Sequence, residues 1–181
     1  MALENEPRAV VFIDEAEWIL SHRETQASSV MQRITPLLLA QLSRLFKERT
    51  KPIIIIAATN KPEMIDPAFL RPGRFDKIFY VGLPDINARK EIIKLQLKER
   101  ANKLDEKAID IIAEQLNGYS GADIEKILEE AAFIAFRRED NRTRLITKED
   151  IETAIKNTPP SVTSVEIEKF RKWAKERGTD R

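Results

Sequence analysis

Two short apolar runs each end in polar side chains of a kind that could act on a phosphate. Residues 9–13 are followed by Asp14-Glu15, and residues 53–58 are followed by Thr59-Asn60. In phosphoryl transfer, one carboxylate of such a pair can hold a magnesium ion through its water shell, while the other orients and polarises the attacking water. An amide at the same height can fix that water and sense a γ-phosphate. The pattern is therefore compatible with a phosphate-hydrolysing site.

The acidic pair has two other interpretations. An acid directly after a strand is common at helix N termini, so Asp14 and Glu15 could cap the following helix, and the pair alone does not separate this role from a catalytic one. A metal-dependent nuclease or phosphatase site could also use carboxylates. The sequence offers a single acidic pair with no ligand histidine nearby, which disfavours that third interpretation.

A second group that could bind phosphate is the turn Arg71-Pro72-Gly73-Arg74. Its two guanidinium groups stand three positions apart, in a turn that proline stiffens and glycine frees. Such a fork can reach a phosphate bidentately, as an arginine finger from a neighbouring subunit does. Taken alone, these four residues fit a solvated basic turn better.

The elements that must position these groups follow from the apolar pattern. Both runs are continuous and β-branched, as expected for strands that are covered on both faces. Apolar residues at helical spacing lie between them, so a crossover helix should join two parallel strands. Ligand sites in open parallel sheets lie at the carboxyl ends of strands, where both polar groups stand. A third strand is predicted at residues 77–81. The helical spacing is carried by Met31, Ile34, Leu38, Leu42 and Leu45.

After Pro84 the pattern is helical only. Asp85 caps a predicted helix that runs to about Arg100, and a second helix stops at Asn117-Gly118. A third opens with the capping box Ser120-Gly121-Ala122-Asp123, a fourth opens at residues 147–150, and a last helix covers residues 165–177. The predicted fold class is α/β followed by all-α: a partial parallel sheet to about residue 83, then a small helical bundle with a tail.

Composition narrows the function classes. With 42% hydrophobic and 34% charged residues, the chain suits a folded protein. Its 31 basic and 30 acidic residues give a net charge of +1, so no nucleic-acid partner is expected. The longest apolar stretch, Ile53 to Ala58, is too short to span a membrane, and the first residues do not form a secretory signal. Zero cysteines exclude disulfides and thiolate metal sites, which fits a cytoplasmic protein.

In order and spacing, the motifs together closely resemble the AAA family of ATPases. The resemblance is carried by residues 10–15, 57–60 and 65–76, and Gly121-Ala122-Asp123 matches the start of the lid helix in that family. It covers residues 7–157. By resemblance, Asp14 and Glu15 form the Walker B pair, with Asp14 holding Mg²⁺ through water.

The same resemblance implies roles for the remaining candidate residues. Asn60 corresponds to sensor one, and Arg71 and Arg74 correspond to the arginine fingers. Gly121 and Ala122 would touch the adenine side of ATP. The family also implies a homo-hexameric ring of neighbouring subunits that hydrolyses ATP with Mg²⁺ and remodels or unfolds protein substrates.

The resemblance divides the chain into three parts. Residues 1–83 correspond to the C-terminal part of the ATPase core, 84–157 to the helical lid, and 158–181 to a C-terminal linker and helix. The tail, which begins Thr158-Pro159-Pro160, looks like that of two groups. One is the second ring of the valosin-containing-protein type, and the other is the katanin, spastin and ESCRT-disassembly clade.

One motif of the family is absent from the sequence. A P-loop needs Gly-x-x-x-x-Gly-Lys-Ser/Thr to cradle phosphates, and none of the five glycines begins such a run. The family's aromatic pore loop also lies upstream of the Walker B strand. We therefore expect an inactive fragment of an ATPase motor that starts at Walker B. The alternative is a non-catalytic interaction module, in which lid and tail bind a neighbouring subunit or partner. The glycines are Gly73, Gly82, Gly118, Gly121 and Gly178.

Overall fold

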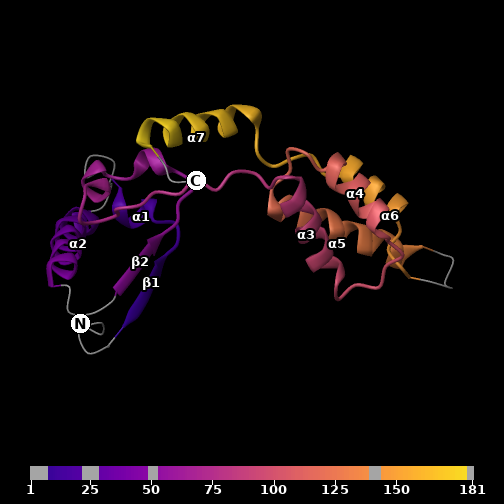
Figure 1. The fold of residues 1–181 in the computed structure, drawn as a ribbon, viewed down its shortest axis with the longest axis horizontal. Coiled ribbons are helices and arrows are strands. Elements are labelled where there is room, and N and C mark those ends of the chain that lie inside the picture. Colours follow the sequence, from indigo (N-terminus) through magenta and orange to yellow (C-terminus); the bar gives the residue numbers. More distant parts are fainter. Residues whose placement is uncertain (1–7, 22–28, 49–52, 139–143, 179–181) are drawn as a thin grey trace. The chain divides into compact units, whose positions relative to one another are not determined.

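The computed structural model describes residues 8–21, 29–48, 53–138 and 144–178 (Figure 1). It separates the chain into two compact units. The first comprises residues 1–80 together with 172–181, and the second comprises residues 81–171. Each unit is described by itself. The predicted class, an α/β core followed by a helical lid, is confirmed.

The first unit is built on two parallel strands, β1 (Ala9–Ile13) and β2 (Ile53–Ala57). Their register pairs Ala9 with Ile53 and Ile13 with Ala57. The predicted crossover is confirmed, because α1 (Glu17–Leu20) and α2 (Ser29–Glu48) stand between the strands in the chain. Two short 3-10 helices follow β2, η3 (Pro62–Met64) and η4 (Pro67–Leu70). The buried core of this unit consists of Ala16, Leu20, Leu42, Ile65 and Phe69.

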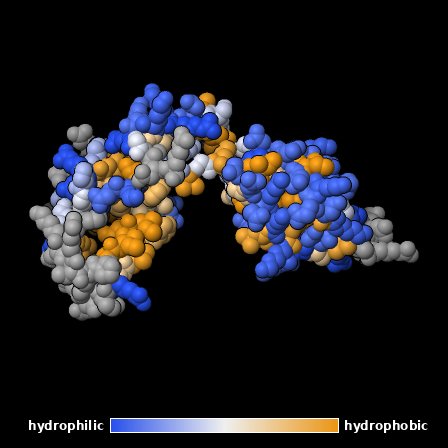
Figure 2. All heavy atoms as spheres, viewed as in Figure 1, coloured by the Kyte–Doolittle hydropathy of each residue, from blue (hydrophilic) through white to orange (hydrophobic). Residues whose placement is uncertain are grey.

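Within the ranges that the structure describes, one face of this sheet is covered and the other is exposed, so the prediction of two covered faces is wrong there. Ile13 and Ile55 pack against the core, whereas Val10 and Phe12 are 67% and 62% exposed. Ile54 and Ile56 of β2 are exposed as well. Figure 2 shows a hydrophobic area over this part of the unit. The described helices supply contacts to one face only, so alternate residues of each apolar run are partly buried and the residues between them are exposed.

The third predicted strand, residues 77–81, is also wrong. Within it only Phe79 takes a bridge position, and no strand is formed. A strand needs a ladder of backbone hydrogen bonds to a neighbour. In the ranges that the structure describes, no strand pairs along this segment, and Val81 is 90% exposed.

The second unit begins with three helices, α3 (Ile86–Leu97), α4 (Glu106–Gln115) and α5 (Gly121–Arg137). Helix α6 (Lys148–Asn157) packs on α5. In α7 (Ser164–Arg177), residues 164–171 belong to the second unit and residues 172–177 belong to the first. Among the described helices, none is both long and apolar enough to cross a membrane. The predicted caps are confirmed: Asp85, Ser120 and Thr147 each accept a hydrogen bond from the first turn of their helix. The largest buried side chains are Ile93, Ile112, Leu116, Ile124, Ile127, Leu128 and Ile151.

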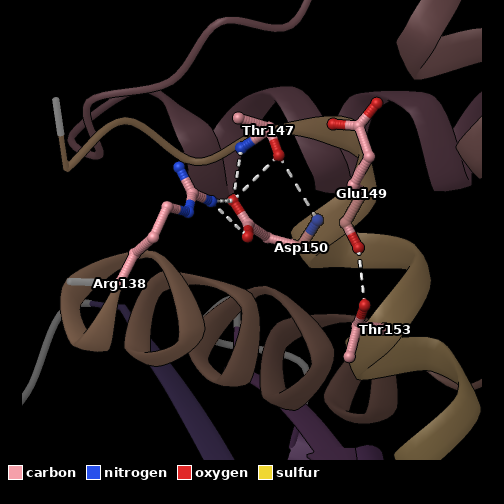
Figure 3. Close-up of polar contacts among 5 residues, drawn as sticks. All are labelled: Arg138, Thr147, Glu149, Asp150 and Thr153. Atoms are coloured by element: carbon pink, nitrogen blue, oxygen red, sulfur yellow. Dashed lines mark hydrogen bonds and ion pairs between the residues drawn. The ribbon is translucent and has the colours of Figure 1, made fainter. Parts of the chain in front are cut away.

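An ion pair joins the end of α5 to the start of α6 (Figure 3). Asp150 accepts hydrogen bonds from Thr147 N at 2.8 Å and from Thr147 Oγ1 at 3.0 Å, which completes the capping box. Arg138 Nη2 donates to both carboxylate oxygens of Asp150. Burial raises the pKa of Asp150, but the bonds from Arg138 and Thr147 outweigh it and hold the pKa below its ordinary value. The contacts fix one junction of the bundle.

Candidate functional site

The ends of β1 and β2 are tied together beyond the paired strands. Ala58 N donates to Ile13 O at 2.8 Å, and Ala16 N donates to Ala58 O at 2.9 Å. These bonds place Asp14-Glu15 and Thr59-Asn60 side by side at the carboxyl edge of the sheet. Asp14, Glu15 and Asn60 are all exposed there. The structure thus brings together the acidic pair and the amide in the way that the strand pattern predicts.

The backbone at Glu15 lies in the left-handed region, with φ 47°. In the described part of the chain it is the one residue other than glycine with positive φ. Asp14 Oδ1 accepts a hydrogen bond from Glu15 N at 2.9 Å. The N-cap of α1 is Ala16, and no side chain caps that helix, so the capping interpretation of the acidic pair is not supported. The left-handed backbone conformation of Glu15 is strained, because Glu15 is not a glycine. Backbone strain of this kind is often found at functional sites.

Two residues after the acidic pair stands a buried carboxylate that was not predicted from the sequence. Glu17, the first residue of α1, is 5% exposed. The Thr59 hydroxyl donates to Glu17 Oε2, and the Thr59 Oγ1 atom accepts from Lys61 N at 3.0 Å. One sequence signal was available: Glu17 stands among the apolar residues Ala16 and 18–20, where a buried charge needs a partner.

The arginine turn is held in shape by its own backbone. Gly73 has φ 82°, a conformation that glycine adopts without strain, and its N–H donates to Asp76 Oδ1 at 2.7 Å. Phe75 N donates to Phe69 O at 3.1 Å, and the Phe69 ring is fully buried. The turn that Pro72 and Gly73 were expected to form is therefore anchored in the core of the first unit.

The two arginines of this turn have different surroundings. Arg74 donates from Nη1 to Ala68 O, and from Nε to Ser43 Oγ at 3.3 Å. Arg71 is exposed, and within the described ranges its side chain forms no hydrogen bond or ion pair. Arg71 is therefore available to a ligand outside the unit, whereas Arg74 is engaged inside it.

Gly121 and Ala122 belong to the second unit, whereas the acidic pair belongs to the first. Gly121 is the first residue of α5, and Ala122 is exposed. A methyl group added at Gly121 would meet only Ile92 Cδ1, at an ordinary 3.8 Å. The contacts of the described residues therefore do not require glycine here. The first N–H groups of a helix have no partner within the helix and suit an anionic or polar ligand.

Next to these two residues, Asp123 holds the segment after α6. Its Oδ2 atom accepts from Ser120 N at 2.9 Å and from Ser161 Oγ at 3.0 Å. Burial raises the pKa of Asp123, but the bonds from Ser120 and Ser161 outweigh it and leave the pKa below its ordinary value. The capping box was predicted from the sequence. The link to Ser161 was not, because it joins residues 38 positions apart.

The carboxylates at the strand ends suit Mg²⁺ only if water and substrate phosphates supply its remaining ligands. Among the described residues, no group of three or more carboxylate, histidine or cysteine side chains could hold a metal ion. Mg²⁺ typically takes one or two carboxylates and completes its shell with water and substrate phosphates. Asp14 fits that use, because it is exposed and only one of its oxygens accepts a hydrogen bond from Glu15 N.

Three family models match the chain. The model described as "ATPase family associated with various cellular activities (AAA)" matches residues 1–83, and the "AAA+ lid domain" matches residues 108–153. The chain belongs to the AAA family of ATPases. A third model, the "Vps4 C terminal oligomerisation domain", matches residues 132–178 of this AAA chain.

Relatives of the AAA chain include two curated proteins from different domains of life. A cell division cycle protein 48 homolog of Archaeoglobus fulgidus is 39% identical over 90% of the chain and 24% of its own length. Spastin of Dictyostelium discoideum is 33% identical over 94% of the chain and 27% of its own length. The chain thus spans about a quarter of the length of these relatives.

The fold of the AAA chain is also similar to that of a solved domain. The crystal structure of the FIGL-1 AAA domain in complex with ADP superimposes with a TM-score of 0.79 at 26% identity. The match covers 92% of this chain and 57% of that domain. The likeness extends through both units of the chain in sequence order.

Proposed function

We propose that residues 1–181 form the water-activating part of an AAA motor that hydrolyses ATP and remodels or unfolds protein substrates in a hexameric ring. The observation that carries the proposal is the shared edge at which Asp14, Glu15 and Asn60 stand, with the Glu15 backbone held at φ 47°. Residues 1–83 would be the C-terminal part of the ATPase core, residues 84–157 the lid, and residues 158–181 the linker and last helix. We place this motor in the cytoplasm, as the cysteine-free sequence favours.

In the proposed reaction, each polar group at the strand ends has one task. The Glu15 carboxylate accepts a proton from the attacking water and so orients it toward the γ-phosphate. The Asn60 amide fixes the same water and contacts the γ-phosphate. Asp14 holds Mg²⁺ through a water ligand, and bound Mg²⁺ would neutralise charge on the β- and γ-phosphates. Gly121 and Ala122 contact the adenine side of the nucleotide.

Hydrolysis also needs a P-loop to bind the phosphates, and residues 1–181 do not contain one. No Gly-x-x-x-x-Gly-Lys-Ser/Thr run occurs in them, so the P-loop must come from outside these residues. We use "complete motor" for the protein in which residues 1–181 act together with such a P-loop. The 181-residue chain alone should release no phosphate above background.

The arginine turn would complete the site of a neighbouring subunit. Arg71 is exposed and unengaged within the described residues of its own unit, which supports a contact to the neighbour's γ-phosphate. Arg74 could join as a second finger only by giving up its bonds to Ala68 O and Ser43 Oγ. The match to an oligomerisation domain supports ring assembly.

Mixed rings test this assignment. Complete motors with Arg71→Ala retain their own Glu15, and complete motors with Glu15→Gln retain their own arginines. Neither preparation should hydrolyse ATP alone, whereas mixed rings should recover activity wherever an intact arginine meets an intact Glu15. Rings that form from the mixture and stay inactive would show that Arg71 does not act across the subunit interface.

The alternative function is a non-catalytic interaction module. In that case the second unit and the tail would bind a neighbouring subunit without nucleotide turnover. A complete motor that assembles into rings but hydrolyses no ATP, with or without Glu15, would support this alternative.

A further inference from the structure

We propose that Glu17 is a positioning residue for Asn60 and acts on it through the Thr59 hydroxyl. The inference rests on the proposed function, since Asn60 is the amide expected to hold the attacking water. Glu17 is 5% exposed, and its Oε2 atom accepts the hydrogen bond that the Thr59 hydroxyl donates. Neither residue contacts the nucleotide in the proposed mechanism.

The Glu17 carboxylate fixes the direction of a hydroxyl that could otherwise rotate. A threonine hydroxyl has one proton to donate and two lone pairs to accept with. Because its proton is directed at Glu17, a lone pair of Thr59 Oγ1 is free to accept from Lys61 N at 3.0 Å. This bond from residue 61 to the side chain of residue 59 closes a tight turn around Asn60. The backbone of Asn60 is therefore held from both sides.

The same contacts tie Asn60 to the acidic pair. Glu17 comes two residues after Glu15, and Ala16, which lies between them, donates its N–H to Ala58 O at 2.9 Å. Two contacts thus set the spacing between the Glu15 carboxylate and the Asn60 amide. One is the backbone bond to Ala58 O, and the other is the hydrogen bond from the Thr59 hydroxyl to Glu17. We refer to the contacts among Glu17, Thr59 and Lys61 N as the Thr59 latch.

Amide hydrogen exchange measured by NMR on the 181-residue chain tests the latch without ATP. Thr59→Val keeps the shape of the side chain and removes the hydroxyl, so exchange at Lys61 N should quicken about fivefold to tenfold, as expected for one lost hydrogen bond. Glu17→Ala should quicken it in the same direction, and Glu17→Gln should quicken it less, because its amide oxygen can still accept from the Thr59 hydroxyl. Thr59→Ser keeps the hydroxyl and should restore slow exchange. Thr153→Val removes a hydroxyl of the second unit and should leave Lys61 unchanged.

Steady-state kinetics of the complete motor test the positioning role. Glu17→Ala and Thr59→Val should each lower kcat by about tenfold to a hundredfold, as small misplacements of reacting groups do, with KM for ATP within about twofold. Because the two residues act on one turn, the double variant should be no slower than the slower single variant. Thr59→Ser should recover most of the lost kcat. A residue that only stabilises the fold would lower the melting temperature and leave kcat of the folded fraction unchanged.

The outcomes separate this inference from the proposed function. If the wild-type complete motor hydrolyses ATP and Glu15→Gln does not, but Glu17→Ala retains the wild-type kcat, the positioning role of Glu17 is overturned by itself. Unchanged exchange at Lys61 N in both Glu17 variants overturns the latch. If the wild-type complete motor does not hydrolyse ATP, the proposed function fails, and the positioning role falls with it even where the exchange results hold.

Discussion

The left-handed backbone of Glu15 gives a prediction that reverses the usual effect of glycine. At an ordinary position, glycine is less stabilising than alanine, since glycine loses more conformational freedom on folding. At φ 47° alanine is strained and glycine is not. Replacing Glu15 by glycine should therefore give a more stable chain than replacing it by alanine. Both variants lack the carboxylate, so its chemistry cancels in the comparison.

The size of the effect follows from two opposed quantities. A side chain in the left-handed region costs roughly 1–2 kcal/mol, which Glu15→Ala retains and Glu15→Gly relieves. The entropy lost by glycine costs about 0.5–1 kcal/mol. The free energy of unfolding of Glu15→Gly should thus exceed that of Glu15→Ala by up to about 1.5 kcal/mol, with a midpoint of about 0.75 kcal/mol. Arg71 offers the matched control, because it is exposed and has φ −78°. There, glycine should be less stable than alanine by about 0.5–1 kcal/mol.

Urea unfolding followed by tryptophan fluorescence measures the difference. Both tryptophans, Trp18 and Trp173, belong to the first unit, so the signal reports the unit that contains Glu15. The four variants should differ in midpoint and share one slope. If Glu15→Gly is less stable than Glu15→Ala by the margin seen at Arg71, the strain at Glu15 is refuted. The reason for linking this backbone to a functional carboxylate would then be lost.

Three other predictions concern contacts within one unit or the other. Asp150→Ala should lower the free energy of unfolding of the second unit by about 2 kcal/mol, since it removes a buried acceptor of bonds from Arg138 and Thr147. Asp110→Ala, which breaks an exposed ion pair with Lys90, should lower the free energy of unfolding by less than about 1 kcal/mol. Circular dichroism during urea unfolding measures the free energy of unfolding of both variants. The folded-state pKa of Asp150 is lowered, so the contribution of its carboxylate to the free energy of unfolding should be complete above about pH 4 and should disappear as the pH falls further. If the difference in free energy of unfolding between wild type and Asp150→Asn grows below pH 4, this prediction is contradicted. Arg74→Ala should lower the stability of the first unit by about 1 kcal/mol, whereas Arg71→Ala should change it by less than about 0.5 kcal/mol; equal effects would contradict their different surroundings.

Local signals made much of this fold predictable. The order of the strands and the helices of the second unit followed from apolar spacing, and Asp85, Ser120 and Thr147 marked helix starts because their side chains accept bonds from the first turn. The strand ends placed Asp14-Glu15 beside Thr59-Asn60, since parallel neighbours end at one edge. Each of these inferences depends on residues a few positions apart.

The failures arose where distant partners decide the outcome. Residues 77–81 have a strand-like sequence, but a strand needs a neighbour, and that need is not visible in the segment itself. Continuous apolar runs in β1 and β2 predicted two covered faces, yet the core contacts only one. The Thr59 latch joins residues 42 positions apart, so no local pattern predicts it. The positive φ of Glu15 could not be predicted either, because no residue type near it indicates a left-handed backbone.

Phosphate release by the complete motor, measured together with nucleotide binding, tests the central claim most directly. Wild-type motor with Mg²⁺ should hydrolyse ATP at an ordinary enzymatic rate, on the order of 1 s⁻¹ or faster. Glu15→Gln should bind ATP with nearly unchanged affinity and lose hydrolysis by at least about a hundredfold, because the amide keeps the shape but accepts no proton. Hydrolysis that survives in Glu15→Gln, or that falls only as far as nucleotide binding falls, would contradict the assignment of Glu15 as the group that activates water.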